Sequence, residues 1–422
     1  MSVESPIWQA SKCWRSRFRQ QRFETPSRRT SERSSNPRKR CLKPKKRSES
    51  SSDRFIVRPS GSTTGYHRGV TTVDRTIPLD VLQSGPSRPL YANGPRSLES
   101  VRMLRISVTD RCNLRCGYCM PAGGVSFQSK DDLLSPKDLA RISGFAHRLG
   151  VRHFKITGGE PTVRSDLVEI IQRIRAIGPS DLSMTSNGLQ MPRLAGALKE
   201  AGIDRVTLSV DSLRPDRYRD ITGGGRFDLF ERGLEAAAEV FGTVKLNVVV
   251  MRGVNDDEVA DFAGLARDRD WTVRFIEFMP LGSSVLADGE AARYLVTADE
   301  VTSNIEAVHG PLDPVESSAD PGVGPARLLA MPGGRGRIGL IHAMSRPFCE
   351  TCNRLRLTSS GILRSCLFDG GEVDLMPILR EESGDSEVAG DRSLRDAFAR
   401  CTAMKPEVHA ARGGRAMSSI GG

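Results

Sequence analysis

Short apolar segments rich in β-branched residues alternate with longer amphipathic segments from residue 102 onward. Strands are predicted near residues 103–108, 152–157, 181–185, 205–210, 243–250 and 272–278. Apolar positions spaced by three and four residues predict helices near residues 136–149, 165–177, 192–201, 226–241 and 256–269. Helix starts are marked by Ser135 with Pro136 and by Ser165. This alternation is typical of an α/β fold with a parallel sheet, whose functional residues stand at the carboxyl ends of the strands. Six units are too few for a closed eight-unit barrel, so a doubly wound sheet and an open barrel both fit the pattern.

The pattern changes after Met279 and Pro280. A helix is predicted near residues 297–308, followed by a loop of Gly, Pro and Ser over 310–325. Short strands are predicted after this loop, near residues 326–331, 336–342, 354–358 and 362–367. These elements divide the folded part of the chain into a larger domain over residues 99–280 and a smaller domain over 281–422.

Residues 1–98 are rich in Ser, Arg and Pro and show no sustained apolar period, which predicts a disordered leader. The whole chain has a net charge of +11, and residues 1–60 alone hold 17 Lys and Arg against 5 Asp and Glu, a balance of +12. The other 362 residues therefore have a net charge of −1, which does not favour nucleic-acid binding by the rest of the chain.

An Arg-rich, acid-poor leader without an apolar segment is typical of a transit peptide and predicts the mitochondrial matrix. A solvated tail and a nuclear signal are the alternatives. No apolar run approaches the roughly 18 residues of a membrane span, so no membrane partner is expected.

Six of the nine cysteines fall into two tight groups, which favours metal binding over disulfides. Cys112, Cys116 and Cys119 have the spacing C-x3-C-x2-C directly after the first strand. Zinc sites favour C-x2-C pairs instead. Because a cubane iron–sulfur cluster has four irons, three local thiolates leave one iron open to a further ligand such as S-adenosylmethionine (SAM). Cys13, Cys41 and Cys401 show no pairing scheme.

The second group, Cys349, Cys352 and Cys366, has the spacing C-x2-C-x13-C across a predicted hairpin. By spacing alone a zinc ribbon and an iron–sulfur cluster are equally compatible. Arg354 and Arg356 stand two apart on a strand and therefore face the same side, beside these cysteines. Arginine forks suit phosphate oxygens, which favours a cluster next to a phosphorylated substrate.

Two motifs together resemble the radical-SAM superfamily. The first is Cys112 to Cys119 with Tyr118 before the last cysteine, and the second is Gly158-Gly159-Glu160-Pro161 at the end of the next strand. A closer resemblance, to the GTP 3',8-cyclases of molybdenum cofactor synthesis, rests on four segments. These are residues Leu104–Pro121, Arg274–Met279, Cys349–Cys366 and the terminal Gly421-Gly422. The resemblance covers about residues 100–422 and implies an incomplete (βα)6 barrel of the TIM type with a smaller C-terminal domain carrying a second cluster.

The resemblance also implies cofactors and site residues. Two [4Fe–4S] clusters would be held by the two cysteine groups. SAM would contact Tyr118, Gly159, Ser209 and Met279. GTP would contact Arg105, Lys155, Thr185, Lys245, Arg274, Arg354, Leu355 and Arg356. The residues implied in catalysis are Arg105, Arg354, Arg356, Gly421 and Gly422, the two glycines reaching the active site as a C-terminal tail.

The implied reaction is the first step of molybdopterin synthesis. A 5'-deoxyadenosyl radical takes the 3' hydrogen of GTP, and C3' then bonds to guanine C8 to give 3',8-cyclo-7,8-dihydro-GTP. The second open iron would hold the purine. The expected partners are a reductant protein, a downstream cyclic pyranopterin monophosphate synthase and a second copy of the chain in a homodimer.

Three departures from the family pattern stand out. His153 occupies a position where this family usually has Lys, and Lys155 one where it usually has Arg. Residues Glu407–Arg415 differ from the usual segment before the tail. The rival interpretations are a peptide-modifying radical-SAM enzyme with auxiliary clusters and a zinc-stabilised nucleic-acid-binding protein.

Overall fold

A computed structural model describes residues 94–421 except 95, 122, 123, 125, 283, 285, 287–290, 316–323, 369, 370, 382–386 and 411. The predicted leader up to residue 93, with Cys13 and Cys41, and the terminal Gly422 lie outside the described residues. The leader was predicted to extend to residue 98, but its last residues are folded. Leu98 in the 3-10 helix η1 (Leu98–Ser100) is buried in the hydrophobic core, and Arg96 Nε donates a hydrogen bond of 2.8 Å to the carbonyl of Lys405.

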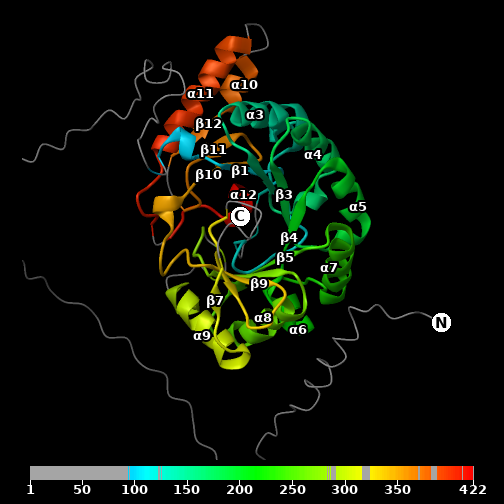
Figure 1. The fold of residues 1–422 in the computed structure, drawn as a ribbon. Coiled ribbons are helices and arrows are strands. Elements are labelled where there is room, and N and C mark those ends of the chain that lie inside the picture. Colours follow the sequence, from blue (N-terminus) through cyan, green and yellow to red (C-terminus); the bar gives the residue numbers. More distant parts are fainter. Residues whose placement is uncertain are drawn as a thin grey trace, which may run out of the picture. The chain divides into compact units, whose positions relative to one another are not determined.

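Six parallel strands and their helices form the central part of the fold (Figure 1). The strands are β1 (Met103–Ser107), β2 (His153–Thr157), β3 (Asp181–Ser186), β4 (Arg205–Ser209), β5 (Lys245–Val250) and β6 (Thr272–Glu277). The helices are α3 (Pro136–Arg148), α4 (Leu167–Arg175), α5 (Met191–Ala201), α6 (Pro215–Ile221), α7 (Phe227–Phe241) and α8 (Val259–Asp268). All six predicted strands and five predicted helices are present, and α6 is the one helix of this central part that was not predicted. Ser135 begins α3 through a reciprocal capping box with Asp138.

The C-terminal segment adds strands to both edges of this sheet. Its elements are α9 (Ala298–His309), β7 (Asp313–Pro314), β8 (Arg327–Ala330), β9 (Arg337–Ile341), β10 (Arg354–Leu357), β11 (Ile362–Arg364), β12 (Glu372–Asp374), α10 (Met376–Glu381), α11 (Glu387–Ala403) and α12 (Met417–Ile420). The order in the described sheet is β12-β11-β10-β1-β2-β3-β4-β5-β6-β9-β8-β7. The predicted smaller domain therefore shares its sheet with the barrel, because β10 pairs with β1 and β9 pairs with β6 in parallel.

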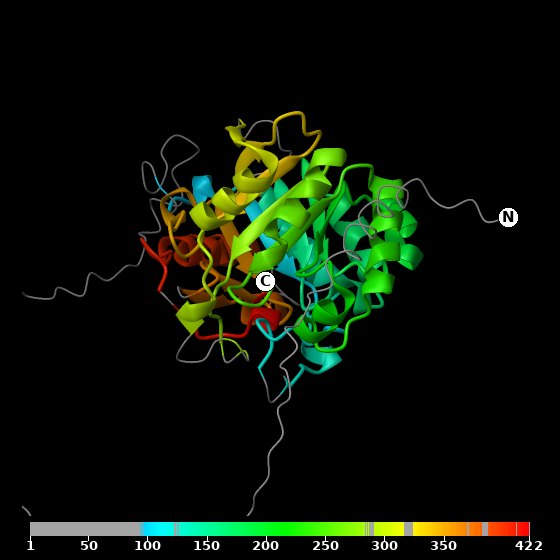
Figure 2. The same cartoon turned by 90° about the horizontal axis from the view of Figure 1, so that it is seen from below.

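The strands curve around α12, while α3 to α8 lie on the outer side (Figure 1). This arrangement selects the incomplete barrel over the doubly wound sheet, between which the sequence pattern did not decide. Figure 2 shows the red C-terminal segment next to the cyan segment that follows β1. No helix among the described residues is both long and apolar enough to span a membrane.

Successive side chains of each strand alternate between the hydrophobic core and the inside of the barrel. Fully buried apolar side chains face the outer helices, and they include Leu104, Phe154, Leu182, Leu246, Val273 and Leu355. The residues between them face the inside of the barrel, since successive side chains of a strand point to opposite faces. The polar and charged positions of the strands are thereby collected on one concave surface.

The pairing register of the strands places positively charged residues of neighbouring strands level with one another. Arg105 on β1 is level with Arg356 on β10 and with Lys155 on β2. Adjacent strands lie about 4.8 Å apart, so these three side chains begin side by side. Asn247 on β5 is likewise level with Arg274 on β6.

Candidate active site

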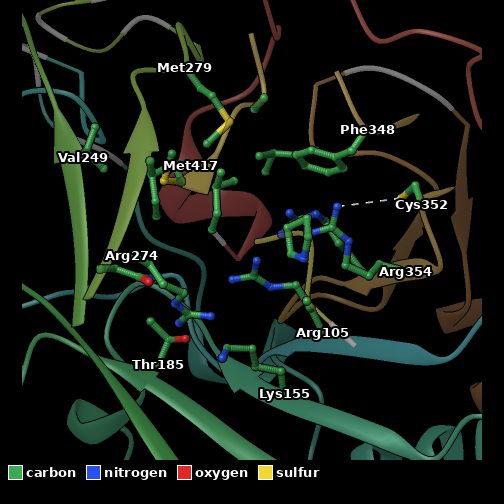
Figure 3. A pocket seen from close by; sticks show the side chains of 18 of the residues that line it. Arg105, Lys155, Thr185, Val249, Arg274, Met279, Phe348, Cys352, Arg354 and Met417 are labelled. Atoms are coloured by element: carbon green, nitrogen blue, oxygen red, sulfur yellow. Dashed lines mark hydrogen bonds between the residues drawn. The ribbon is translucent and has the colours of Figure 1, made fainter. Parts of the chain in front are cut away.

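One cavity of the described structure opens inside the barrel and collects most of the predicted substrate residues (Figure 3). Its lining includes the cations Arg105, Lys155, Lys245, Arg274, Arg354 and Arg356. It also includes the predicted contacts Tyr118, Thr185, Ser209 and Met279. Cys349, Cys352 and Cys366 stand in the same wall. Residues as far apart in the chain as Met103 and Met417 thus meet around one cavity.

The cations in this cavity raise one another's electrostatic energy. Burial lowers the pKa of Lys155 well below its ordinary value, and the neighbouring Arg274 and Arg105 lower it further. Burial and then Arg354 lower the pKa of Arg356 to about 10. The pKa of Arg105 is also lowered, first by burial and then by the neighbouring Arg356. Such a group of buried like charges is stabilised by a polyanion, because the anion relieves the repulsion.

The first cysteine loop follows β1 at the carboxyl end of the sheet. Cys112, Cys116 and Cys119 are free thiols, and the pKa of each is raised, mainly by burial and to about 12 for Cys119. Other cysteines of the group also raise the pKa values of Cys116 and Cys119, which indicates that the three sulfurs lie near one another. Metal ligation by these thiols requires loss of their protons.

The glycine motif packs directly on the cysteine loop. Gly159 N donates to Thr109 O at 2.7 Å, and Glu160 N donates to Arg111 O at 2.8 Å. A Cβ on Gly159 would lie 2.4 Å from Arg111 O, which no rotamer change relieves because the neighbour is backbone. Gly159 does not line the cavity with the other predicted SAM contacts, and its glycine identity is explained by this backbone approach.

Glu160 supports the loops around the site, a role that the sequence did not indicate beyond its motif. Its carboxylate is 1% exposed and accepts hydrogen bonds from Thr162 N, Ser186 Oγ and Asn187 N. Asn187 Nδ2 in turn donates to Asn113 Oδ1 in the cysteine loop at 2.7 Å. Glu160 therefore ties the ends of β2 and β3 to the loop.

Asp211 has a similar position two residues after β4. Its carboxylate accepts hydrogen bonds from the Tyr118 hydroxyl at 2.9 Å and from Val249 N at 2.8 Å. Burial raises the pKa of Asp211 to about 6. The available sequence signal was an acidic residue just past the carboxyl end of a parallel strand. Asp211 thus orients Tyr118 at the cavity wall.

The second cysteine group is held by β10 and the turn before it. The β10–β11 hairpin pairs Arg356 with Arg364 and returns Cys366 to the first two cysteines, as the sequence predicted. Burial raises the pKa of the Cys352 thiol, but Arg354 and Lys405 outweigh burial and leave that pKa below its ordinary value. Arg354 Nη2 lies 4.0 Å from Cys352 Sγ (Figure 3), and Lys405 Nζ donates to Cys352 O at 2.8 Å.

Both cysteine groups suit a cluster by the chemistry of their donors. Each offers three free thiols on short spacings and faces no disulfide partner among the described residues. No three His, Cys, Asp or Glu side chains in the described part of the chain converge on the place of one metal ion. A four-iron cluster has a different requirement, since each thiolate binds its own iron.

The C-terminal tail enters the cavity. Met417 of α12 lines it, and Gly421 O accepts a hydrogen bond of 2.8 Å from Arg356 Nη1. The backbone of Ser418 lies near the Cys119 thiol and lowers its pKa, against the larger effect of burial. Gly282 N donates to Gly413 O at 2.8 Å, so the chain leading to the tail is held at the barrel rim. Gly421 thus lies next to Arg356, one of the cavity cations.

Two predicted features lie away from the cavity. Leu355 is fully buried in the hydrophobic core, because it alternates with Arg354 and Arg356 on β10, so its side chain is not in a position to contact GTP. His153 stands at the start of β2, where its Nδ1 lies 3.7 Å from Asp181 Oδ2. Asp181 also accepts two hydrogen bonds of 2.7 Å, from Nε and from Nη2 of Arg205. His153 and Asp181 do not line the cavity, but Arg205 does, so the replacement at residue 153 changes a polar cluster that borders the cavity.

Comparison with known proteins agrees with this architecture. The Radical SAM superfamily matches residues 106–266, and the family described as Molybdenum Cofactor Synthesis C matches residues 271–411. A GTP 3',8-cyclase of Moorella thermoacetica is 44% identical over 328 residues, which are 76% of this chain and 98% of that protein. The chain belongs to the GTP 3',8-cyclase family. A further family member, from Geobacter sulfurreducens, is 45% identical over 73% of this chain and 91% of its own length.

Membership in this family confirms the predicted radical-SAM enzyme and the predicted fold class. Among solved structures, Streptococcus suis SuiB bound to its precursor peptide SuiA is 15% identical, with a TM-score of 0.48 over 71% of this chain and 64% of that chain. The structure described as native anSMEcpe with bound AdoMet is 14% identical, with a TM-score of 0.42 over 76% of this chain and 92% of that chain.

Proposed function

We propose that the chain converts GTP to 3',8-cyclo-7,8-dihydro-GTP in the barrel cavity. The single observation that carries the proposal is the row of Arg356, Arg105 and Lys155 across three adjacent strands, between the two cysteine groups. A triphosphate needs several cations, and this row with Lys245 and Arg274 supplies them on rigid strands.

The two cysteine groups would hold two different clusters. Cys112, Cys116 and Cys119 would hold the cluster that binds SAM, and Cys349, Cys352 and Cys366 would hold a second [4Fe–4S] cluster next to the purine. When bound, the first cluster and SAM supply a radical that takes a hydrogen atom from the ribose.

The chain's own residues orient the substrate. Arg354 and Arg356 lie beside the second cysteine group, so they fix the phosphates and the base relative to each other. Asp211 holds Tyr118 in the wall near the first group. The tail contacts Arg356 through Gly421 O and would help to keep water from the reacting atoms.

Anaerobic incubation of the reduced protein with SAM and GTP tests the proposal. We expect deoxyadenosine and a cyclised nucleotide in the mass spectrum, and about eight irons per chain from two clusters of four. Deoxyadenosine without a GTP-derived product would reject the substrate. Four irons with one bound zinc would reject the second cluster.

The Arg-rich leader supports import into the mitochondrial matrix, which we include in the proposal. A fluorescent protein fused to residues 1–98 is expected in mitochondria, and its retention in the cytosol would contradict this. We further propose a reductant protein, a cyclic pyranopterin monophosphate synthase that consumes the product, and a homodimer. Sedimentation of the purified holoenzyme tests the dimer.

A further inference from the structure

The outer surface of the first cysteine loop carries two arginines on one aromatic ring. The guanidinium carbons of Arg111 and Arg115 lie 5.6 and 5.5 Å from the ring centroid of Phe127. Both arginines are exposed. Arg115 Nη1 donates to Cys112 O at 2.7 Å, and Arg111 Nη2 donates to Gln128 O at 3.2 Å. The ring and the carbonyls thus hold both charges in place directly beside a cluster ligand.

These two arginines differ from other exposed arginines of the described structure. Arg148, Arg173 and Arg226, for example, each lie within 4.0 Å of a carboxylate oxygen. Arg111 and Arg115 form no such ion pair with any described residue, and they donate to backbone carbonyls, which carry no net charge. The loop therefore presents two positive charges that the described part of the chain does not neutralise.

The position of this surface determines what it suits. The inner side of the loop faces the cavity through Tyr118 and touches the tail through Ser418. In the proposed function, SAM and GTP occupy that side, so an electron for the first cluster has to enter from the outer side. Complementary charge accelerates the encounter of two proteins, and electron-transfer contacts are typically small.

We propose that Arg111, Arg115 and Phe127 form the docking surface for an acidic one-electron carrier protein, a ferredoxin or flavodoxin type of partner. This inference rests on the proposed function. One electron passes from the reduced carrier to the oxidised cluster at Cys112, Cys116 and Cys119. No proton or group is transferred, and the carrier leaves oxidised by one electron.

The test measures reduction of the holoenzyme by an acidic [2Fe–2S] ferredoxin in a stopped-flow experiment, without GTP. The second-order rate of cluster bleaching is compared for the wild type, R111Q/R115Q, R111K/R115K and the control R193Q/R392Q. The control removes two exposed charges from α5 and α11, away from the loop. Reduced methyl viologen, a small cation that arginines do not attract, serves as the second reductant.

We expect R111Q/R115Q to lose about tenfold or more of the ferredoxin rate, with an unchanged viologen rate. The Lys variant and the control should keep most of the ferredoxin rate. The wild-type ferredoxin rate should fall as salt rises, and the double Gln variant should show a weaker fall. A ferredoxin rate equal to wild type in R111Q/R115Q would overturn the proposal.

If the Gln variant loses iron, the wild-type salt series and the Lys variant decide. A wild-type ferredoxin rate that stays constant or rises with salt concentration overturns the proposal. A wild-type rate that falls steeply with salt concentration, with the same fall in the Lys variant, supports it. Product analysis with SAM and GTP under viologen is a separate measurement. Absence of cyclised nucleotide there would reject the proposed function, while the ferredoxin rates would still decide the docking surface.

Discussion

Substitution of Gly421 by alanine tests whether the docked tail is part of the active site. Gly421 is buried with φ of +71°, in the left-handed region. A Cβ at this residue would lie 2.9 Å from Ser107 Cβ and 3.3 Å from Thr157 Cγ2. Ser107 Cβ is attached directly to the backbone of β1, so it cannot rotate away from the new methyl group.

The size of the effect follows from two alternatives. If the tail stays docked, G421A incurs about 1–2 kcal/mol for a left-handed conformation with a Cβ, before any clash is added. If the tail leaves, the hydrogen bond from the charged Arg356 to Gly421 O is lost, which costs about 1.5–3 kcal/mol. The 1–2 kcal/mol of strain in the docked state lowers the docked population roughly 5- to 30-fold relative to the wild type.

Turnover of GTP by the reduced holoenzyme and hydrogen exchange of residues 417–421 are the two assays. We expect G421A to lose turnover in proportion to the faster exchange of the tail, with little change in Tm because few residues undock. Gly414 offers a matched control, since its added methyl group meets nothing within 4 Å and its φ is not positive. Turnover of G421A equal to that of G414A would refute the reasoning.

Three further predictions concern the cavity and its supports. K155M should raise the KM for GTP about tenfold or more and leave the ligand-free protein at least as stable, because it removes a buried cation that Arg274 and Arg105 repel. K199M on the exposed side of α5 is the control. An unchanged KM for GTP in K155M would contradict the assignment of Lys155 to the substrate site. E160A should lower the free energy of unfolding by about 2 kcal/mol or more, because Asn187 N and Thr162 N lose their buried acceptor. Urea unfolding measures this free energy, with E200A as the surface control. A loss below about 0.5 kcal/mol would be inconsistent with the hydrogen-bond network. The folded-state pKa of Asp211, about 6, lies above the ordinary value of 3.8. Protonation of Asp211 therefore stabilises the fold, and this contribution of about 3 kcal/mol is fully present below pH 3.8 and is lost as the pH rises through 6. D211N should therefore gain stability relative to the wild type between pH 4 and pH 7, and a pH-independent difference between the two proteins would count against this pKa.

Much of the barrel was predictable because its signals are local. Apolar alternation located the strands, and Ser135 with Pro136 located the start of α3. The cysteine spacings identified both candidate cluster sites, because thiols a few residues apart remain near one another in most folds. The resemblance added the cavity residues, and the structure brings nearly all of them into one lining.

The same local signals failed where the partner was distant in the chain. Leu355 was placed in the substrate site with its neighbours, although strand alternation sends it to the core. The C-terminal strands were assigned to a separate domain, because no local pattern shows which sheet edge a short strand will join. Glu160 and Asp211 were missed as supports, since all their hydrogen-bond partners except Thr162 lie 26 to 93 residues away.

The sequence by itself determined the two thiol groups, the strand and helix alternation and the glycine-bearing tail, since residue identity and spacing decide these. Only the tertiary structure decided that Arg356, Arg105 and Lys155 form one row, that Gly421 meets Arg356, and that Arg111 and Arg115 stack on Phe127. The physical reason is that sheet register and tail docking arise from packing between distant segments. The energies that select them are sums over many contacts and have no signature in any one segment.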